Sequence, residues 1–197
     1  MPNQFDFDKL FNNRPYSRDQ VLVERNPIPM CSGIYAWFFK EIPPNIITDR
    51  CSKNYDLTLL YVGISPKSIN SHQTIRDRIK FHFTGDAGSS TLRFTLGCLL
   101  SNVLGIKLRL VGDNQRKIFC VGETRRGEDI LSEWMRENAF VSWVHIEEPW
   151  LVERNIIANT FLPLNLQHNQ QNINYLTVSQ IRMQANIIAQ TLPPILR

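Results

Sequence analysis

Hydrophobic residues along this chain occur in two patterns, short continuous runs and a helical spacing of three or four. Short runs rich in aromatic and branched side chains predict strands, and helical spacing predicts amphipathic helices. Strands are expected at 34–39, 58–64, 106–111, 117–121 and 139–146. Helices are expected at 74–83, 91–104, 128–138 and 148–160, and in a last segment capped by Thr177 or Ser179 and ended by Pro193 and Pro194. This order predicts an α/β (α+β) fold in which helices flank a small mixed or antiparallel central sheet.

The helix expected at 74–83 has one clear apolar stripe. Thr74 is a possible N-cap, and Ile75, Ile79 and Phe83 recur at helical spacing. We expect this stripe to dock on the sheet.

Composition indicates one globular domain with a sizeable core. The chain has 197 residues, of which 43% are hydrophobic and 20% charged. Its best apolar stretch, 94–100, is far shorter than the ~20 residues of a membrane span, and the polar N-terminus does not resemble a signal peptide. We therefore expect a cytoplasmic protein without a membrane partner.

The charge and the cysteines exclude some chemistry. Of the 22 basic side chains 15 are Arg, which mildly favours binding of planar anions such as phosphate. The 4 Cys include no CxxC pair, so a zinc site is not expected. The chain also lacks a GxSxG elbow, a P-loop, an HExxH motif, an EF-hand loop and any Lys preceded at two positions by Asp or Glu.

Two tyrosines stand two positions from a glycine, in mirror-image order, on the first two predicted strands. If Gly33 lies opposite Gly63 in an antiparallel pair, Tyr35 lies opposite Tyr61, and all four share one face. The glycines would then leave a notch for the close approach of a ligand. The alternative is an aromatic cross-strand pair that serves only packing.

The helix at 74–83 places two polar side chains beside this notch. Arg78 and His82 are four positions apart, so they share one helical face. Arg76 and Lys80 add positive charge nearby and are candidate DNA-binding residues.

These residues together resemble the GIY-YIG nuclease superfamily. Gly33-Ile34-Tyr35 and Tyr61-Val62-Gly63 precede Arg78-x3-His82, and Glu153 and Asn165 follow in the family's order. The resemblance covers about residues 31–166. The Arg-x3-His spacing is closer to the restriction and homing endonucleases than to the excision-repair branch.

The resemblance implies an endonuclease that hydrolyses phosphodiester bonds in DNA, with duplex DNA as the expected substrate. Glu153 would hold one divalent ion, Mg²⁺ or Mn²⁺, because magnesium accepts a shell made mostly of water. Arg78 would clamp a phosphate oxygen, and His82 would orient the water or donate to phosphate. A motif tyrosine, Tyr35 or Tyr61, would be the general base, and a neighbouring cation must then offset burial.

Three further residues and the domain limits complete the expectation. Asn165 would support either Glu153 or a motif strand. Lys67 is the nearest counterpart of a lysine that repair-type members carry after the second motif, and Arg93 is either a phosphate contact or a surface arginine. The expected parts are an N-terminal extension (1–28), a nuclease-like domain (29–168) with an elaboration at 85–104, and a C-terminal helical tail (169–197).

Two alternatives remain at this level. A nucleic-acid-binding module would contact backbone phosphates without turnover, and its affinity would fall steeply with salt; its candidate residues are Arg76, Arg78, Lys80, Arg125 and Arg126. A structural protein would have no affinity for DNA. For the enzyme, reading both halves of a palindrome would require two copies, so a homodimer is possible.

Overall fold

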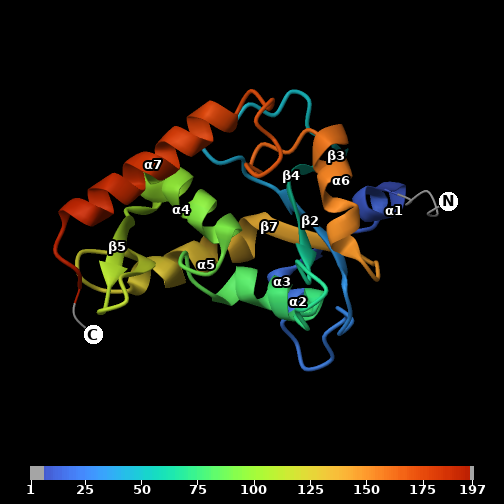
Figure 1. Ribbon diagram of the computed structural model, residues 1–197, viewed down its shortest axis with the longest axis horizontal. Helices are drawn as coiled ribbons and strands as arrows, with labels where there is room; N and C mark the ends of the chain where they lie inside the picture. The colour runs from blue at the N-terminus through green and yellow to red at the C-terminus, as the bar shows by residue number, and fades with distance from the viewer. Residues whose placement is uncertain (1–6, 196–197) are drawn as a thin grey trace.

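The computed structural model describes residues 7–195, in which helices cover both faces of a five-stranded antiparallel sheet (Figure 1). The sheet order is β1-β7-β2-β4-β3, and a separate hairpin is formed by β5 and β6. The strands are β1 (Tyr16–Ser17), β2 (Gly33–Phe39), β3 (Lys53–Asn54), β4 (Leu57–Ser65), β5 (Lys107–Val111), β6 (Arg116–Cys120) and β7 (Ala139–His145). The predicted fold class is confirmed, with an antiparallel sheet.

The helices agree closely with the apolar spacing. They are α1 (Phe7–Asn12), α2 (Arg18–Val21), α3 (Ile75–Thr84), α4 (Thr91–Leu104), α5 (Arg126–Asn138), the 3-10 helix η1 (Pro149–Leu151), α6 (Glu153–Asn159) and α7 (Tyr175–Thr191). The predicted cap of α3 is confirmed, since the Thr74 side chain accepts a hydrogen bond from the Asp77 N–H. The helix expected at 148–160 is divided into η1 and α6, because the short turn at Pro149 stops before Glu153.

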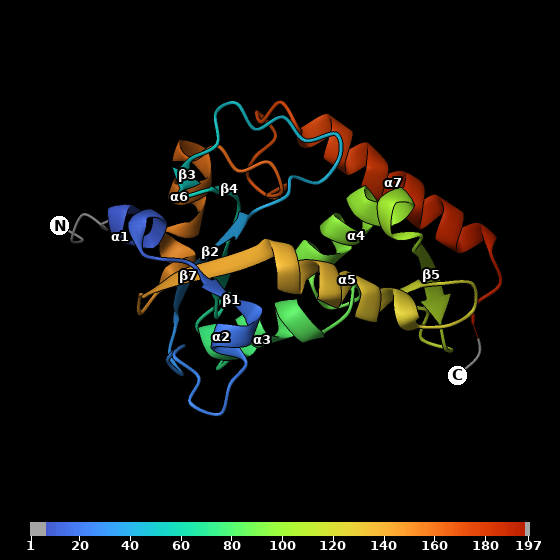
Figure 2. The same cartoon turned by 180° about the vertical axis from the view of Figure 1, so that it is seen from behind.

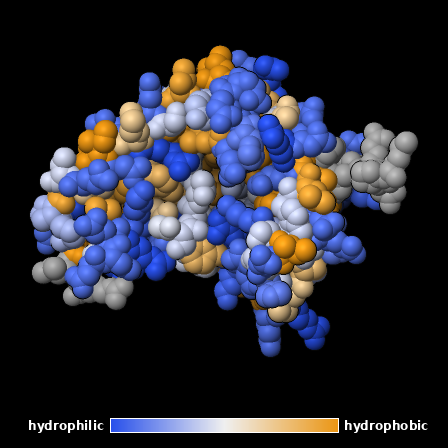
Figure 3. Space-filling model, viewed as in Figure 1, coloured by the Kyte–Doolittle hydropathy of each residue, from blue (hydrophilic) through white to orange (hydrophobic). Residues whose placement is uncertain are grey.

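The last helix starts earlier than predicted. Neither Thr177 nor Ser179 caps it, because α7 begins at Tyr175 after the polar turns of 165–174. The helix lies against α4 and β5, and Figures 1 and 2 show this arrangement from both sides. Apolar side chains of α7 remain at the surface among polar ones, which the space-filling view displays as orange atoms (Figure 3).

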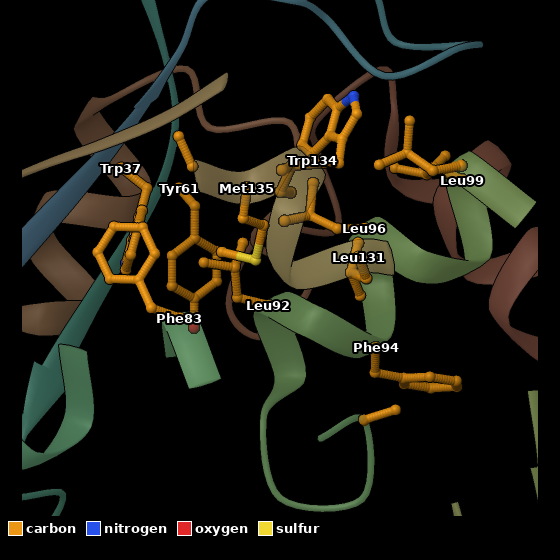
Figure 4. Packing of buried hydrophobic residues seen from close by; sticks show 14 of the residues in the cluster. Trp37, Tyr61, Phe83, Leu92, Phe94, Leu96, Leu99, Leu131, Trp134 and Met135 are labelled. Atoms are coloured by element: carbon orange, nitrogen blue, oxygen red, sulfur yellow. The ribbon is translucent and has the colours of Figure 1, made fainter. Parts of the chain in front are cut away.

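Strand β2 is buried on both faces of the sheet, which explains its unbroken apolar run. Tyr35, Trp37 and Phe39 belong to the core under α3, α4 and α5, whereas alternate residues face α1 and α6. Figure 4 shows the core that lies under α3, α4 and α5, with Trp37, Tyr61 and Phe83 at one end and Phe94 at its margin. The stripe of α3 docks here as expected, with Ile75, Ile79 and Phe83 fully buried.

The register between the motif strands differs from the prediction. Gly33 pairs with Ser65, Tyr35 with Gly63 and Trp37 with Tyr61, so the two tyrosines are not opposite each other. The shift is two residues, which keeps both tyrosines on the predicted face. An irregularity between Trp37 and Phe38 accompanies this register.

Gly33 and Gly63 do not form the ligand-binding notch that the sequence predicted. A Cβ on Gly63 would lie 2.5 Å from the Tyr35 hydroxyl oxygen, and a Cβ on Gly33 would lie 2.3 Å from the Val144 carbonyl oxygen. Both positions are therefore filled by the protein's own atoms, and a ligand does not approach the sheet there.

The N-terminal segment forms part of the sheet, since β1 pairs with β7. Of the expected extension 1–28, residues 1–6 lie outside the described residues, as do 196–197 of the expected tail. Between residues 7 and 195, none of the helices combines the length and apolarity needed to cross a membrane.

Candidate active site

The first motif tyrosine is locked into the floor of the site. Tyr35 is 1% exposed, its ring covers Gly63, and its Oη lies 2.9 Å from His82 Nε2. Burial raises its pKa well above the ordinary value, and the nearby charge of Tyr61 adds to the rise. Tyr35 is therefore a neutral phenol held by hydrogen bonding.

A serine on the far side of His82 holds the second ring nitrogen. Ser90 is the N-cap residue of α4. Its Oγ accepts a hydrogen bond from the Arg93 N–H at 3.1 Å and lies 2.8 Å from His82 Nδ1. Ser90 Oγ and Tyr35 Oη therefore engage the two ring nitrogens of His82, Nδ1 and Nε2, and the tautomer of the ring sets which partner donates in each hydrogen bond.

His82 consequently differs from its expected role. It is fully buried, and burial lowers its pKa, as do the charges of Arg78 and Arg93. Both ring nitrogens are occupied, so neither is available to a phosphate or to the attacking water. His82 instead positions Tyr35.

The second motif tyrosine lines a pocket. Tyr61 is 9% exposed and lines a pocket of about 690 Å³, which Lys67, Glu153 and Asn165 also line. Burial raises its pKa to about 12, and the cations Arg78 and Arg182 oppose that rise. Of the two tyrosines, Tyr61 is thus the one that a bound molecule can touch.

Arg78 lines an adjoining pocket of about 420 Å³. Its Nη1 donates to the Ser89 carbonyl at 3.0 Å, which fixes the guanidinium, while its buried Nε has no hydrogen-bond partner among residues 7–195. The two pockets share Lys67, Thr91, Phe94, Lys117 and Arg182, and together we call them the basic cleft. Its lining residues include side chains of α4, α6 and α7, three helices whose positions are labelled in Figure 1.

Glu153 supplies the carboxylate of the basic cleft. It is the first residue of α6, is half-buried, and forms no ion pair with any residue between 7 and 195. Burial raises its pKa, whereas Lys67 and His168 oppose the rise. In the described residues no three His, Cys, Asp or Glu side chains gather, so the donor set fits an ion bound through one carboxylate and water.

Asn165 supports a motif strand. Its Oδ1 accepts from the Val62 N–H at 2.9 Å, and its Nδ2 donates to the Val62 carbonyl at 2.8 Å. Because Val62 is the neighbour of both Tyr61 and Gly63, this amide closes the edge of β4 beside the basic cleft. The sequence left open whether Asn165 supports Glu153 or a motif strand, and these hydrogen bonds are made to the strand.

We expect Asn165→Ala to lower both stability and cleavage. Two buried backbone groups of Val62 would lose their partner, which costs about 1–3 kcal/mol of unfolding free energy. Loss of such a support should slow cleavage ~10–100-fold. Urea unfolding and plasmid nicking measure the two effects, with the exposed Asn159→Ala as control. A wild-type rate in Asn165→Ala would contradict the assignment.

Arg93 corrects the expected phosphate contact. Its side chain is fully buried, with Nη2 2.7 Å from Glu128 Oε2 and Nη1 donating to the carbonyls of His82 and Phe83. Burial leaves no path to a phosphate, so Arg93 is neither a DNA contact nor a surface arginine. It ties α4 to α3 and α5.

The other expected basic residues divide into two groups. Lys67 is exposed and lines both parts of the basic cleft. Arg76 and Lys80 line neither part, and Arg76 Nε donates to the Ile28 carbonyl at 2.6 Å.

Three residues near the site were missed. The sequence could have identified Ser90, because a serine directly before a predicted helix is typical of an N-cap. No local sequence pattern marks Lys117 or Arg182, because the β5–β6 hairpin and α7 reach the basic cleft through tertiary packing alone.

Comparison with known proteins supports the resemblance. The family model of the GIY-YIG catalytic domain matches residues 33–184, which is most of the chain. Neither the curated proteins nor the solved structures contained a significant match.

Proposed function

Because the chain belongs to the GIY-YIG family of catalytic domains, we propose that it is a metal-dependent endonuclease that hydrolyses phosphodiester bonds in double-stranded DNA. The observation that carries the proposal is the basic cleft, where the Tyr61 hydroxyl, the Glu153 carboxylate and several cations line adjoining pockets. Phosphodiester hydrolysis requires a base, charge neutralisation at phosphorus and help for the leaving oxygen. These side chains can supply all three.

Tyr61 is the general base in this proposal. It contacts the cleft, whereas Tyr35 lies beneath it and is bonded to His82. A base with a pKa of about 12 is weakly ionised at neutral pH, so cations must lower that pKa when substrate binds. Arg78 already acts in that direction.

Arg78 binds the scissile phosphate. The Ser89 carbonyl holds one end of the guanidinium, and the rest of the group lines the cleft. A fixed planar guanidinium offers paired N–H donors to two phosphate oxygens, and it stabilises the charge that develops on them.

Glu153 would hold the divalent ion, Mg²⁺ or Mn²⁺. The ion, when bound, would act as a Lewis acid that neutralises phosphate charge and favours departure of the 3′ oxygen. A half-buried carboxylate that forms no ion pair within residues 7–195 is suited to that task, because it need not release a protein cation first.

Phenylalanine substitutions distinguish the two tyrosines. Tyr61→Phe should slow cleavage ~100-fold, the usual contribution of a general base. Tyr35→Phe should slow it ~10-fold or less, because it removes only a hydrogen bond that supports the site. Single-turnover nicking with saturating protein measures both rates. A larger loss in Tyr35→Phe than in Tyr61→Phe would reverse the assignment.

A supercoiled plasmid with and without magnesium tests the function itself. We expect nicked and linear products only with the metal. A protein that shifts plasmid mobility in either condition without cutting it would be a binding module, the alternative function. Glu153 does not favour that alternative, since an unpaired carboxylate repels phosphate unless a cation lies between them.

A further inference from the structure

Two cations from distant parts of the chain lie over one aromatic ring in the basic cleft. The Arg182 guanidinium carbon lies 4.6 Å from the Phe94 ring centroid, and Lys117 Nζ lies 5.1 Å from it. The three residues come from α7, β6 and α4. Cation–π attraction holds the two charges close together without neutralising them.

These cations have no carboxylate partner. In the part of the chain that the structure describes, neither Arg182 nor Lys117 forms an ion pair. The hydrogen bond of Arg182 is a long one, 3.5 Å from Nη1 to Thr95 Oγ1. Burial lowers the pKa of Arg182, so holding this charge here costs free energy.

Such an arrangement is suited to an anion. Like charges repel, and partly buried ones are screened little by salt. Glu153 is the one acidic residue among those lining the cleft, against the cations Lys67, Arg78, Lys117 and Arg182. A bound anion would relieve the repulsion between Lys117 and Arg182 and accept hydrogen bonds from their N–H groups.

We propose that Phe94, Lys117 and Arg182 form a subsite for a backbone phosphate of the DNA strand, next to the scissile one. The inference rests on the proposed function and adds to it the residues that position the strand. The pocket lined by Arg78 and the pocket lined by Glu153 share Lys117 and Arg182. A strand that brings a phosphate between Arg78 and Glu153 therefore passes these two cations.

The phosphate, and not the base, is the group recognised. Phe94 is 6% exposed and two cations already occupy its surroundings, so it does not offer a stacking face. The subsite therefore contributes affinity and strand position without sequence preference.

Equilibrium binding without cleavage tests the subsite. Fluorescence anisotropy with a duplex of about 20 base pairs in EDTA, from about 50 to 200 mM salt, gives both the Kd and its salt dependence. We expect Lys117→Gln and Arg182→Gln each to weaken binding about tenfold and to reduce the slope of log K against log salt by about one. Arg182→Lys keeps the charge but loses the planar guanidinium over Phe94, so it should lose less affinity than Arg182→Gln and keep the salt slope of the wild type.

Lys107→Gln is the matched control, since it removes one exposed positive charge outside the cleft. If both Gln variants bind with the Kd and salt slope of Lys107→Gln, the subsite does not exist. If the wild type binds and cuts DNA while only this test fails, the proposed function stands without the subsite. A wild type that neither binds nor cuts DNA would overturn the function and the subsite together.

Discussion

Glu153→Gln should lose about a thousandfold of the metal-dependent cleavage rate and keep its affinity for DNA. The amide has nearly the shape of the carboxylate but lacks the charge that a divalent ion requires. Removing one preorganised electrostatic contribution costs ~10²–10³ in rate, and loss of a metal ion costs several kcal/mol of transition-state stabilisation.

Binding should respond in the opposite direction. In EDTA the Glu153 carboxylate lies among cations that attract the phosphate backbone, and it repels that backbone. Glu153→Gln removes the repulsion, so its Kd in EDTA should equal that of the wild type or be lower by up to about threefold. A variant that binds as well but no longer cuts would separate the enzyme from a binding module.

The matched control is Glu148→Gln, which removes an exposed carboxylate just before η1. Nicking of supercoiled plasmid with magnesium, under single-turnover conditions, measures both variants. A Glu153→Gln rate within about tenfold of the wild type would show that the ion is held elsewhere, and the role of Glu153 would be wrong.

Periodicity predicted which residues share a face but not which residues are opposite each other. Tyr35 and Tyr61 lie on one face of the sheet, as a period of two requires. A register shift of two residues leaves that face unchanged, so the alternation cannot detect it. Gly63 is the residue that decides the register, because only its missing side chain admits the Tyr35 ring.

Long-range charge pairing was equally hidden from the sequence. Arg93 lies on an apolar helix, where a surface position or a phosphate contact was the natural reading. Its partner Glu128 is 35 positions away, on a different helix. The same is true of Arg182, whose place in the basic cleft depends on how α7 packs on α4. Local motifs were therefore predicted well, and the contacts between distant elements were not.

Glu128→Ala should be the most destabilising single substitution considered for this protein. Glu128 Oε1 accepts from the N–H groups of Ala87 at 3.0 Å and Phe119 at 2.9 Å, and Oε2 accepts from Arg93 Nη2 at 2.7 Å. The substitution leaves a fully buried guanidinium without its counter-charge, which costs about 3–5 kcal/mol. Urea unfolding followed by circular dichroism measures the loss.

Activity should fall with this stability loss, because Arg93 also connects the ion pair to the site. Its Nη1 donates to the carbonyl of His82 at 3.2 Å, and its N–H donates to Ser90, which bonds the His82 ring. An uncompensated Arg93 will move toward water and disturb both contacts. We therefore expect slower cleavage in Glu128→Ala even at temperatures where the variant is folded.

Two variants make this expectation specific to the buried pair. Glu133→Ala removes one partner of a solvent-exposed ion pair with Arg136 on the same helix, and its free energy of unfolding should stay close to that of the wild type. Arg93→Met combined with Glu128→Gln removes both charges, and should recover part of the loss because no buried charge is left unpaired. Equal, small losses in Glu128→Ala and Glu133→Ala would mean that water reaches Arg93, and this ion pair would then not be what holds α4 to α5.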